Sequence, residues 1–362
     1  MSRRAGRRRA VLAGLGVLAA ATSPLARSVT WPAVLPGRPL HFPEDHGAHP
    51  QYRTEWWYLT GWLDPGTAPR GFQVTFFRNR PGIAEDLPVA SAPRQLLFAH
   101  AALAVPEQGR LLHDQRSARA AWGLAFAREG RLDVAIDDWS LRMTESGGLH
   151  AEIRAAAFEL DLDLSPSGPL LPEGTGGFSR KGPQPAEASY YYSWPQLRVR
   201  GQVRLATAER AIEGVAWLDH EWSTEYMAAQ AVGWDWTGIN LDDGGALMAF
   251  RMRAADGTPL WSGGTWRRAD GSVRTLRDGE IEFHVLRTWR SPATGAVYPV
   301  SMRVSAPGLA LELAPLFDSQ ELDARASVGT VYWEGAVEAR EGGRRTGRGY
   351  LELTGYAGRL TL

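Results

Sequence analysis

The side chains best suited to chemistry lie close together in one stretch, residues 214–236, which reads GVAWLDHEWSTEYMAAQAVGWDW. Its ionisable and aromatic members include Asp219, His220, Glu221, Trp222, Trp234, Asp235 and Trp236. Acid–base groups beside large apolar rings are what a site needs to move protons on a hydrophobic molecule, or to grip one. The alternative interpretation is structural, with the tryptophans in a core and the charged residues at a salt-bridged strand end.

If the stretch is an enzyme site, its chemistry is acid–base catalysis. The candidate catalytic residues are Asp219, His220, Glu221 and Asp235. Successive side chains of a strand point to opposite faces, so the first and third of these share one face, and His220 shares the other with Trp222. We expect His220 and Trp222 to face the ligand. Asp219 or Glu221 would then be structural and pair with Arg53 or another arginine.

A second group of polar residues could bind a metal. Residues 41–50 read HFPEDHGAHP and contain His41, Glu44, Asp45, His46 and His49. Histidine and carboxylate side chains suit zinc or iron. Their spacing matches no defined metal pattern, however, and the prolines and the glycine indicate an irregular loop. We therefore expect no metal and no other cofactor here, and interpret the segment as a lead-in that hydrogen-bonds across the mouth of the fold.

Residues 1–28 have the pattern of an export signal. An arginine-rich start is followed by the apolar run 10–21 and then by small residues. The run is shorter than the roughly 20 residues of a transmembrane helix. The pair Arg8-Arg9 before it resembles a twin-arginine signal. The sequence thus predicts a periplasmic protein, and the alternative is an uncleaved membrane anchor.

The composition is that of a protein with a full hydrophobic core. Of the 362 residues 44% are hydrophobic, and 15 are Trp, which suggests apolar pockets or dense strand packing. The formal net charge is +0, so a nucleic-acid partner is not expected. The Cys count is 0, which excludes disulfides and thiolate sites.

The elements that must position these residues are strands. Short runs of strand-forming residues alternate with turn residues from position 55 to the C-terminus, and no segment shows a long helical period. The Gly- and Pro-rich segment 166–188 is expected to be a long loop over a barrel mouth. The fold class predicted is all-β.

An internal repeat divides the chain. Trp56, Tyr58, Leu63 and Asp64 recur 178 residues later as Trp234, Trp236, Leu241 and Asp242. Residues 76–78 likewise match 249–251, and Gly214, Trp217, Leu218 and Asp219 match Gly347, Tyr350, Leu351 and Glu352. Closing a sheet removes its edges, so we predict two consecutive antiparallel barrels, 31–224 and 225–362, related by duplication. A single large sandwich is the alternative. The second copy lacks the His-acid pair of the first, so the site is expected near the join.

Together these stretches resemble the carotenoid 1,2-hydratase (hydroxyneurosporene synthase) and AttH-like family. The matching stretches are FPEDHGAHPQYRTEWWYLTGWL (42–63), FAHAAL (98–103), YYYSWPQLRVRG (190–201), GVAWLDHEWS (214–223), GWDWTGINL (233–241), and YWEG with GYLELTGY near the C-terminus. The resemblance implies two lipocalin-like barrels. It also implies one of two roles. One branch of the family hydrates the terminal double bond of acyclic carotenoids. Other branches are exported proteins, often linked to ABC-type export systems, and the signal-like N-terminus favours these.

Two functions therefore compete. The first is a periplasmic binding protein for a small hydrophobic, isoprenoid- or lipid-like molecule, with an ABC-type export system as a partner and peripheral membrane association as a further expectation. The second is a hydro-lyase that adds water to an isolated double bond of an acyclic isoprenoid. The ligand-binding residues expected in either case are Glu55, Trp57, Tyr58, His100, Tyr191, Trp222, Trp234 and Trp236.

Overall fold

The computed structural model describes residues 29–64, 66, 68–89, 91–206 and 208–359, so the predicted export signal lies outside the described residues. Within these ranges the helical elements are two 3₁₀ turns, η1 (Glu44–His46) and η2 (Pro106–Gln108), and all other regular structure is antiparallel β. The all-β prediction is confirmed. No helix in the described part of the chain has the length and apolar character needed to cross a membrane.

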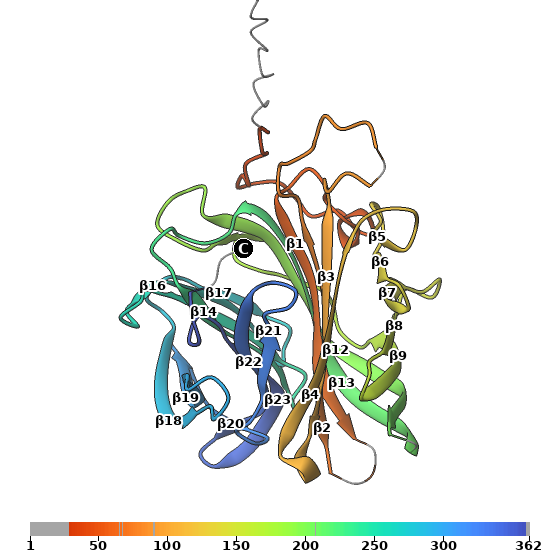
Figure 1. The fold of residues 1–362 in the computed structure, drawn as a ribbon. Helices are drawn as coiled ribbons and strands as arrows, with labels where there is room; N and C mark the ends of the chain where they lie inside the picture. The colour runs from red at the N-terminus through yellow and green to blue at the C-terminus, as the bar shows by residue number, and fades with distance from the viewer. Residues whose placement is uncertain (1–28, 65, 67, 90, 207, 360–362) are drawn as a thin grey trace, which may run out of the picture. The chain divides into compact units, whose positions relative to one another are not determined.

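The first sheet has 13 strands and takes up residues 54–225 (Figure 1). Its main path runs β4-β3-β2-β1-β13-β12-β9-β8-β7-β6-β5, and β10 and β11 pair with β12. The strands are β1 (Thr54–Asp64), β2 (Arg70–Asn79), β3 (Leu96–Val105), β4 (Arg110–Arg119), β5 (Ala125–Ala127), β6 (Asp133–Ile136), β7 (Trp139–Met143), β8 (Leu149–Arg154), β9 (Phe158–Pro166), β10 (Leu171–Pro172), β11 (Phe178–Arg180), β12 (Ala188–Leu205) and β13 (Ala208–Glu225).

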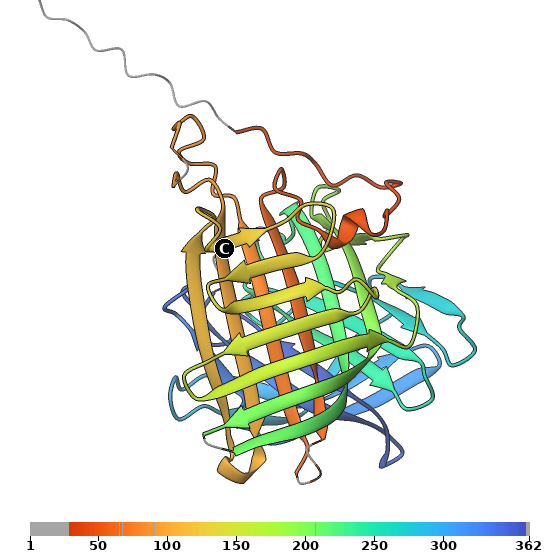
Figure 2. The same cartoon turned by 90° about the vertical axis from the view of Figure 1, so that its right-hand side faces the viewer.

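This sheet folds over on itself around a hydrophobic core. In Figure 2 strands β5–β9 run across the longer strands β1–β4. Alternate residues of β1 and β2, among them Trp57, Leu59, Phe72 and Val74, are buried in this core together with side chains from β6–β9. The period of two in the sequence is what places them on one face.

The second sheet has 10 strands in the order β17-β16-β15-β14-β23-β22-β20-β19-β18, with β21 paired to β22. Its strands are β14 (Gly233–Leu241), β15 (Ala246–Arg253), β16 (Pro259–Arg267), β17 (Val273–Leu276), β18 (Glu282–Arg290), β19 (Val297–Ala306), β20 (Leu309–Pro315), β21 (Glu321–Ala324), β22 (Thr330–Glu341) and β23 (Arg344–Leu353). It encloses a core of its own, centred on side chains such as Ile239, Met302, Trp333 and Leu351.

The internal repeat has a direct counterpart in the strand pairing. The first strand of each copy pairs with the last, β1 with β13 and β14 with β23. Tyr58 lies opposite Asp219 in one copy, and Trp236 lies opposite Glu352 in the other.

The match between residues 76–78 and 249–251 is two positions out of register. Phe77 pairs with Trp56, whereas the residue that pairs with the equivalent Trp234 is Met252. The connection between β14 and β15 is shorter than that between β1 and β2. Matching residues by type alone therefore aligned the second strands of the two copies incorrectly.

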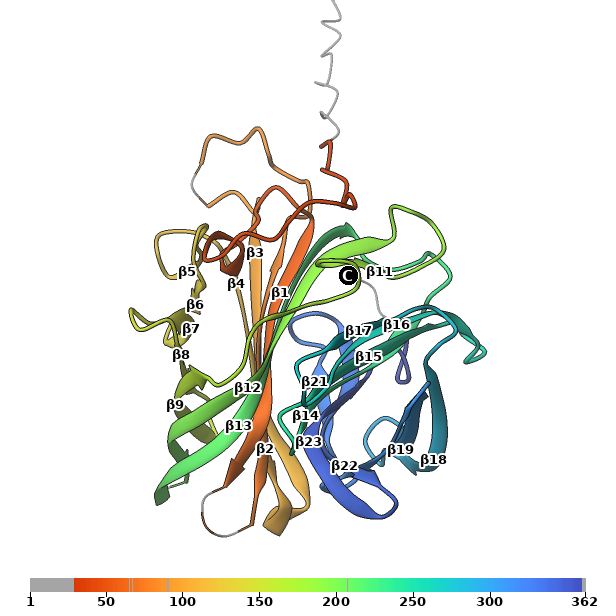
Figure 3. The ribbon, with the colours of Figure 1, turned by 180° about the vertical axis from the view of Figure 1, so that it is seen from behind.

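The two sheets meet along β1, β2, β4, β12 and β13 on one side and β14, β21, β22 and β23 on the other (Figure 3). An apolar cluster that includes Trp62, Trp217, Trp236 and Tyr350 fills the junction. The Trp62 Nε1–H donates to the Gly349 carbonyl oxygen at 2.9 Å. As a result both faces of β13 are covered, one by the core of the first sheet and one by the second sheet.

The segment expected to be a plain loop, 166–188, carries two short strands. β10 and β11 both pair with β12. Backbone hydrogen bonds from Glu173 N to the Tyr191 carbonyl and from Tyr191 N to the Gly177 carbonyl hold the segment against that strand. It therefore contributes fixed side chains, Glu173 and Lys181, to the interior.

Candidate functional site

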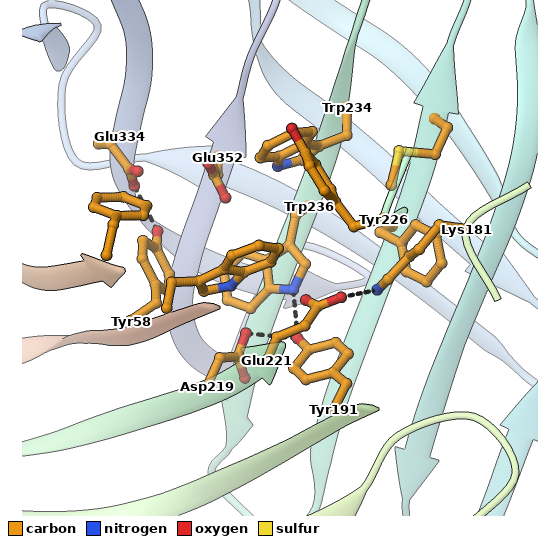
Figure 4. Close-up of a pocket in the computed structure, with 14 residues that line it drawn as sticks. Tyr58, Lys181, Tyr191, Asp219, Glu221, Tyr226, Trp234, Trp236, Glu334 and Glu352 are labelled. Carbon is orange, nitrogen blue, oxygen red and sulfur yellow. Dashed lines mark hydrogen bonds and ion pairs between the residues drawn. The ribbon is translucent and has the colours of Figure 1, made fainter. Parts of the chain in front are cut away.

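A cavity of about 60 Å³ opens where the two sheets meet (Figure 4). Its lining combines eight aromatic rings, four carboxyl groups, one lysine and one methionine. These residues are Trp56, Tyr58, Phe77, Lys181, Tyr191, Asp219, Glu221, Tyr226, Trp234, Trp236, Phe250, Met252, Glu334 and Glu352. Such a cavity offers apolar contact on most sides and proton-bearing groups at a few points.

The two copies of the repeat contribute equivalent positions to this cavity. Four cavity residues of the first copy have an equivalent in the second copy that also lines the cavity. The pairing register of the strands defines which positions are equivalent. The matching pairs are Trp56 with Trp234, Tyr58 with Trp236, Phe77 with Met252, and Asp219 with Glu352. The rings of Tyr58 and Trp236 meet edge to face, with centroids 5.3 Å apart at 84°.

Asp219 is held by three donors. Its Oδ2 accepts a hydrogen bond from the Tyr191 hydroxyl at 2.6 Å, and its Oδ1 lies 2.6 Å from both the Trp217 Nε1 and the Ser193 Oγ. Burial nevertheless raises the pKa of Asp219 to about 7, because the donors only partly offset the loss of water. Asp219 is thus divided between its protonated and ionised forms near neutral pH.

Behind Asp219, Ser193 links it to a second buried carboxyl group. The Ser193 Oγ lies 2.8 Å from Glu173 Oε1 as well as 2.6 Å from Asp219 Oδ1. A hydroxyl has one hydrogen to donate, so both contacts are hydrogen bonds only if one of the two carboxyl groups is protonated and donates back. Burial raises the pKa of Glu173 to about 8, which makes Glu173 the natural holder of that proton.

On the other side of the cavity, two glutamates face each other on neighbouring strands. Glu334 on β22 lies directly opposite Glu352 on β23. Two buried like charges in such a pair cannot both ionise easily, so the pair retains a proton. Burial, together with the charges of Asp219 and Glu221, raises the pKa of Glu352 to about 8. Burial and the Glu352 charge raise the pKa of Glu334 well above its usual range, and Glu334 Oε2 accepts a hydrogen bond from the Tyr58 hydroxyl at 2.5 Å.

Lys181 supplies a positive charge at the cavity wall. Its Nζ lies 2.9 Å from Glu221 Oε1. The same ammonium group lies over two aromatic rings, 4.6 Å from the centroid of Tyr191 and 4.2 Å from that of Phe250. Ser189 also donates to Glu221 through its hydroxyl. Glu221 is therefore a compensated carboxylate, unlike the pair opposite.

His220 and Trp222, which we expected to face the ligand, point away from this cavity. They lie on the other face of β13, as strand alternation requires, and both are fully buried inside the first sheet. His220 Nε2 lies 3.0 Å from Glu55 Oε1, and its Nδ1 lies 2.9 Å from the Asp45 carbonyl oxygen. The expectation for the carboxylates also fails, because Asp219 and Glu221 line the cavity and neither is paired with Arg53 or with any other arginine that the structure describes.

Glu55 and Trp57, also expected at the ligand, belong to the same buried network. The Arg78 Nε donates to Glu55 Oε2 at 2.7 Å, and the Trp57 ring stacks on His220 with centroids 4.8 Å apart. Although burial alone would raise the pKa of Glu55, the Arg78 guanidinium and neighbouring His49 hold it well below its usual range. This arrangement keeps the buried Glu55 carboxylate ionised and anchors the first residues of β1.

The lead-in segment 41–50 closes over this network, as the sequence suggested. His49 lies between two carboxylates, with Nδ1 2.7 Å from Glu55 Oε1 and Nε2 3.0 Å from Asp45 Oδ1. Burial would lower the pKa of His49, but the two carboxylates raise it. The His46 Nδ1 lies 2.7 Å from the Tyr192 hydroxyl.

This network also contains the set of side chains that comes nearest to a metal site among the described residues. Ligand atoms of His49, Glu55 and His220 lie within 4.8 Å of one another. One ring nitrogen of each histidine already lies at hydrogen-bond distance from Glu55 Oε1: His49 Nδ1 at 2.7 Å and His220 Nε2 at 3.0 Å. Hydrogen bonding alone accounts for the geometry, and the absence of a metal remains a prediction.

Two more expected residues serve the fold. Asp235 is fully buried and accepts hydrogen bonds from Arg251 Nε at 2.6 Å, Arg253 Nε at 2.9 Å and the Tyr356 hydroxyl at 2.9 Å. It is therefore not a free proton donor to the cavity. His100 contacts the hydroxyl groups of Tyr332 and Ser327, and burial lowers its pKa to about 3. It joins the two sheets as a neutral ring.

Of the expected site residues, six line the cavity: Tyr58, Tyr191, Asp219, Glu221, Trp234 and Trp236. The sequence reasoning missed the acids of the second copy, Glu334 and Glu352, and the lysine of the 166–188 segment. The repeat already aligned Glu352 with Asp219, so that signal was present. No sequence pattern pointed to Lys181, because it lies in a Gly- and Pro-rich segment.

The sequence pattern of the AttH-like family matches residues 33–356. A crystal structure described as an AttH of Nitrosomonas europaea is 48% identical, with a TM-score of 0.84 over 90% of this chain and 99% of that one. Kievitone hydratase from Nectria haematococca superposes with a TM-score of 0.67 at 14% identity, over 91% of this chain and 97% of its own, which shows a shared fold. The chain has no match among curated proteins.

Proposed function

We propose, starting from the fact that this chain belongs to the AttH-like family, that it binds a small hydrophobic molecule of isoprenoid- or lipid-like character in the cavity between its two sheets. The observation that carries this proposal is the lining itself, in which eight aromatic rings surround a few proton-bearing groups. Aromatic walls provide apolar contact, and the carboxyl and hydroxyl groups orient a ligand. The resemblance to carotenoid 1,2-hydratases favours an acyclic isoprenoid.

The cellular setting belongs to the same proposal. The arginine-rich start and short apolar run of residues 1–28 support export to the periplasm by the twin-arginine route. An ABC-type export system is the partner that the resemblance favours, and peripheral contact with the membrane would deliver a lipid-like ligand.

Binding is tested by titrating the purified protein with an apolar alcohol such as 1-octanol and following tryptophan fluorescence. Three of the cavity rings are indoles, Trp56, Trp234 and Trp236, so occupancy should change the emission. We expect saturable binding that weakens by at least about tenfold in Trp236→Ala, since a large apolar contact is worth roughly 1.5–3 kcal/mol. Replacement of the exposed Trp122, which is 75% exposed, serves as the control. Equal affinity in both variants would move the site elsewhere.

A second candidate function is hydration of an isolated double bond, and the carboxyl groups carry it. Protonating an alkene carbon needs an acid that is still protonated at neutral pH. Burial raises the pKa of Glu352 to about 8 and holds that of Glu334 well above its usual range. Kievitone hydratase shares the fold with this chain, but at 14% identity the shared fold does not indicate a shared reaction.

The reaction would follow three steps. A protonated carboxyl group, Glu352, Glu334 or Asp219, gives its proton to the less substituted alkene carbon, and the π electrons form the new C–H bond. The tertiary cation that results is stabilised by the faces of Trp234 and Trp236, each worth roughly 0.5–2 kcal/mol. Water then adds to the cation and loses a proton to the carboxylate, which restores the acid. His220 and Asp235, the earlier candidates, take no part because neither lines the cavity.

The two candidates are separated by incubating the protein with an acyclic isoprenoid in H₂¹⁸O. A hydratase yields a tertiary alcohol that contains ¹⁸O, and Glu352→Gln should suppress its formation while the ligand still binds. A binding protein yields no such alcohol, although the ligand is retained.

A further inference from the structure

The acidic groups around the cavity outnumber the cationic groups that could pair with them. Four carboxyl groups line it, and among the lining residues that the structure describes Lys181 is the one side chain that can carry a positive charge. Lys181 is committed to Glu221 at 2.9 Å. Within the described part of the chain, Glu334 and Glu352 have no cationic neighbour of this kind. Their pKa values are governed by burial, by other carboxyl groups and by a hydrogen bond with Tyr58 or Trp234. The unmatched groups in this cavity are therefore acids.

The aromatic rings of the cavity already accept a cation. The Lys181 ammonium lies 4.6 Å from the Tyr191 ring centroid and 4.2 Å from that of Phe250. Ring faces attract positive charge through their quadrupole, and desolvation strengthens the attraction. Three further rings of the lining, those of Tyr226, Trp234 and Trp236, have no such partner among the described residues, and Figure 4 draws Trp234 and Trp236 near Glu352.

We propose that the cavity selects a ligand that carries a single positive charge on an apolar body, such as an amine or a quaternary ammonium, over a neutral molecule of the same shape. This inference rests on the proposed function, because it assumes that the cavity binds a hydrophobic molecule, and it names the class of that molecule. The charged end is placed beside Glu352 and Glu334, where its positive charge favours the ionised form of an acid that is protonated in the empty cavity. The apolar body lies against the indole rings. If the protein is a hydratase, the same feature stabilises the cation formed during the reaction.

The test compares two molecules of the same length, octylammonium and 1-octanol, on the full-length protein at neutral pH. Their affinities are measured by isothermal titration calorimetry and by tryptophan fluorescence. We expect octylammonium to bind at least tenfold more tightly. Glu352→Gln and Glu334→Gln each remove one of the unmatched acids and should bring the two affinities together. The exposed Glu282→Gln on β18 is the matched control and should leave the preference unchanged.

The outcomes are distinct. If 1-octanol binds as tightly as octylammonium, the inference is overturned while the proposed binding function stands. If neither molecule binds, the proposed function falls and the inference falls with it. A preference for octylammonium that survives in both glutamine variants shows that Glu334 and Glu352 do not recognise the charge and also overturns the inference. The comparison on the unaltered protein decides the question even if one variant fails to fold.

Discussion

Lys181 Nζ lies 2.9 Å from Glu221 Oε1, and the two side chains are 5% and 6% exposed. The lysine comes from the segment between β11 and β12, and the glutamate comes from β13. This ion pair thus attaches segment 166–188, which has only the short strands β10 and β11, to the wall of the cavity. Removing one partner of a buried pair leaves an uncompensated charge, whereas removing both leaves none.

Lys181→Met should therefore destabilise the fold by about 3–5 kcal/mol, the usual cost of breaking a buried pair. The double variant Lys181→Met/Glu221→Gln should recover a large part of that loss, because no buried charge remains. The free energy of unfolding is measured by urea denaturation of both single variants and the double variant. Additive losses would show that the pair does not interact energetically.

The raised carboxyl pKa values predict that stability falls as the pH rises towards 8. Glu352 binds its proton up to a pH of about 8 when folded, but only up to about 4.3 when unfolded. Its contribution to stability is complete below the unfolded pKa and is lost as the pH rises through the folded one.

Urea denaturation across pH 5 to 9 checks this dependence. Glu352→Gln, which cannot ionise, should show a decline that is smaller by up to about 1.4 kcal/mol per pH unit within that window. Glu282→Gln, exposed on β18, should follow the unaltered protein. Parallel curves for all three proteins would contradict the assignment of Glu352 as a buried protonated acid.

His220 is expected to act through stability. His220→Ala removes a donor to the buried Glu55 carboxylate and should cost at least about 2 kcal/mol of unfolding free energy. The variant should retain ligand affinity if it is assayed well below its unfolding temperature. Thermal melting and 1-octanol titration measure the two effects, with the exposed His284→Ala as the control. A stable His220→Ala protein that no longer binds ligand would return His220 to the site.

Export is predicted to depend on Arg8 and Arg9. Changing both to lysine should leave the precursor in the cytoplasm, because twin-arginine recognition requires the arginine pair. Fractionation followed by immunoblotting measures the distribution. Changing the upstream pair Arg3 and Arg4 to lysine is the matched control and should permit export. Normal export of the Arg8/Arg9 variant would exclude this route.

No resident metal is predicted at His49, Glu55 and His220. Protein purified without added metal should contain far less than one zinc or iron per chain by elemental mass spectrometry. Treatment with a chelator should leave the unfolding free energy unchanged, since the hydrogen bonds of the network need no ion. Stoichiometric metal that disappears in His49→Ala would contradict this prediction.

The alternation of polar and apolar residues was enough to predict an all-β chain, and the internal repeat predicted equivalent places for Trp56 and Trp234. Trp56 and Trp234 occupy equivalent places because each lies on the first strand of its copy, next to the last strand. Alternation also separated Asp219 and Glu221 from His220 and Trp222. These features are local, since they depend on the two-residue period of a strand and on similarity between copies.

Which face of β13 meets the cavity was decided by the tertiary structure. All residues from 216 to 223 are buried, because one face covers the core of the first sheet and the other covers the second sheet. Hydrophobic patterning distinguishes a buried face from an exposed one, and it carries no information when both faces are buried. The partners of the carboxyl groups were also beyond local reasoning. Lys181, Ser193 and Glu334 come from other strands and segments. Their proximity to Glu221, Asp219 and Glu352 depends on the course of segment 166–188 and on the pairing of β12 with β13 and of β22 with β23.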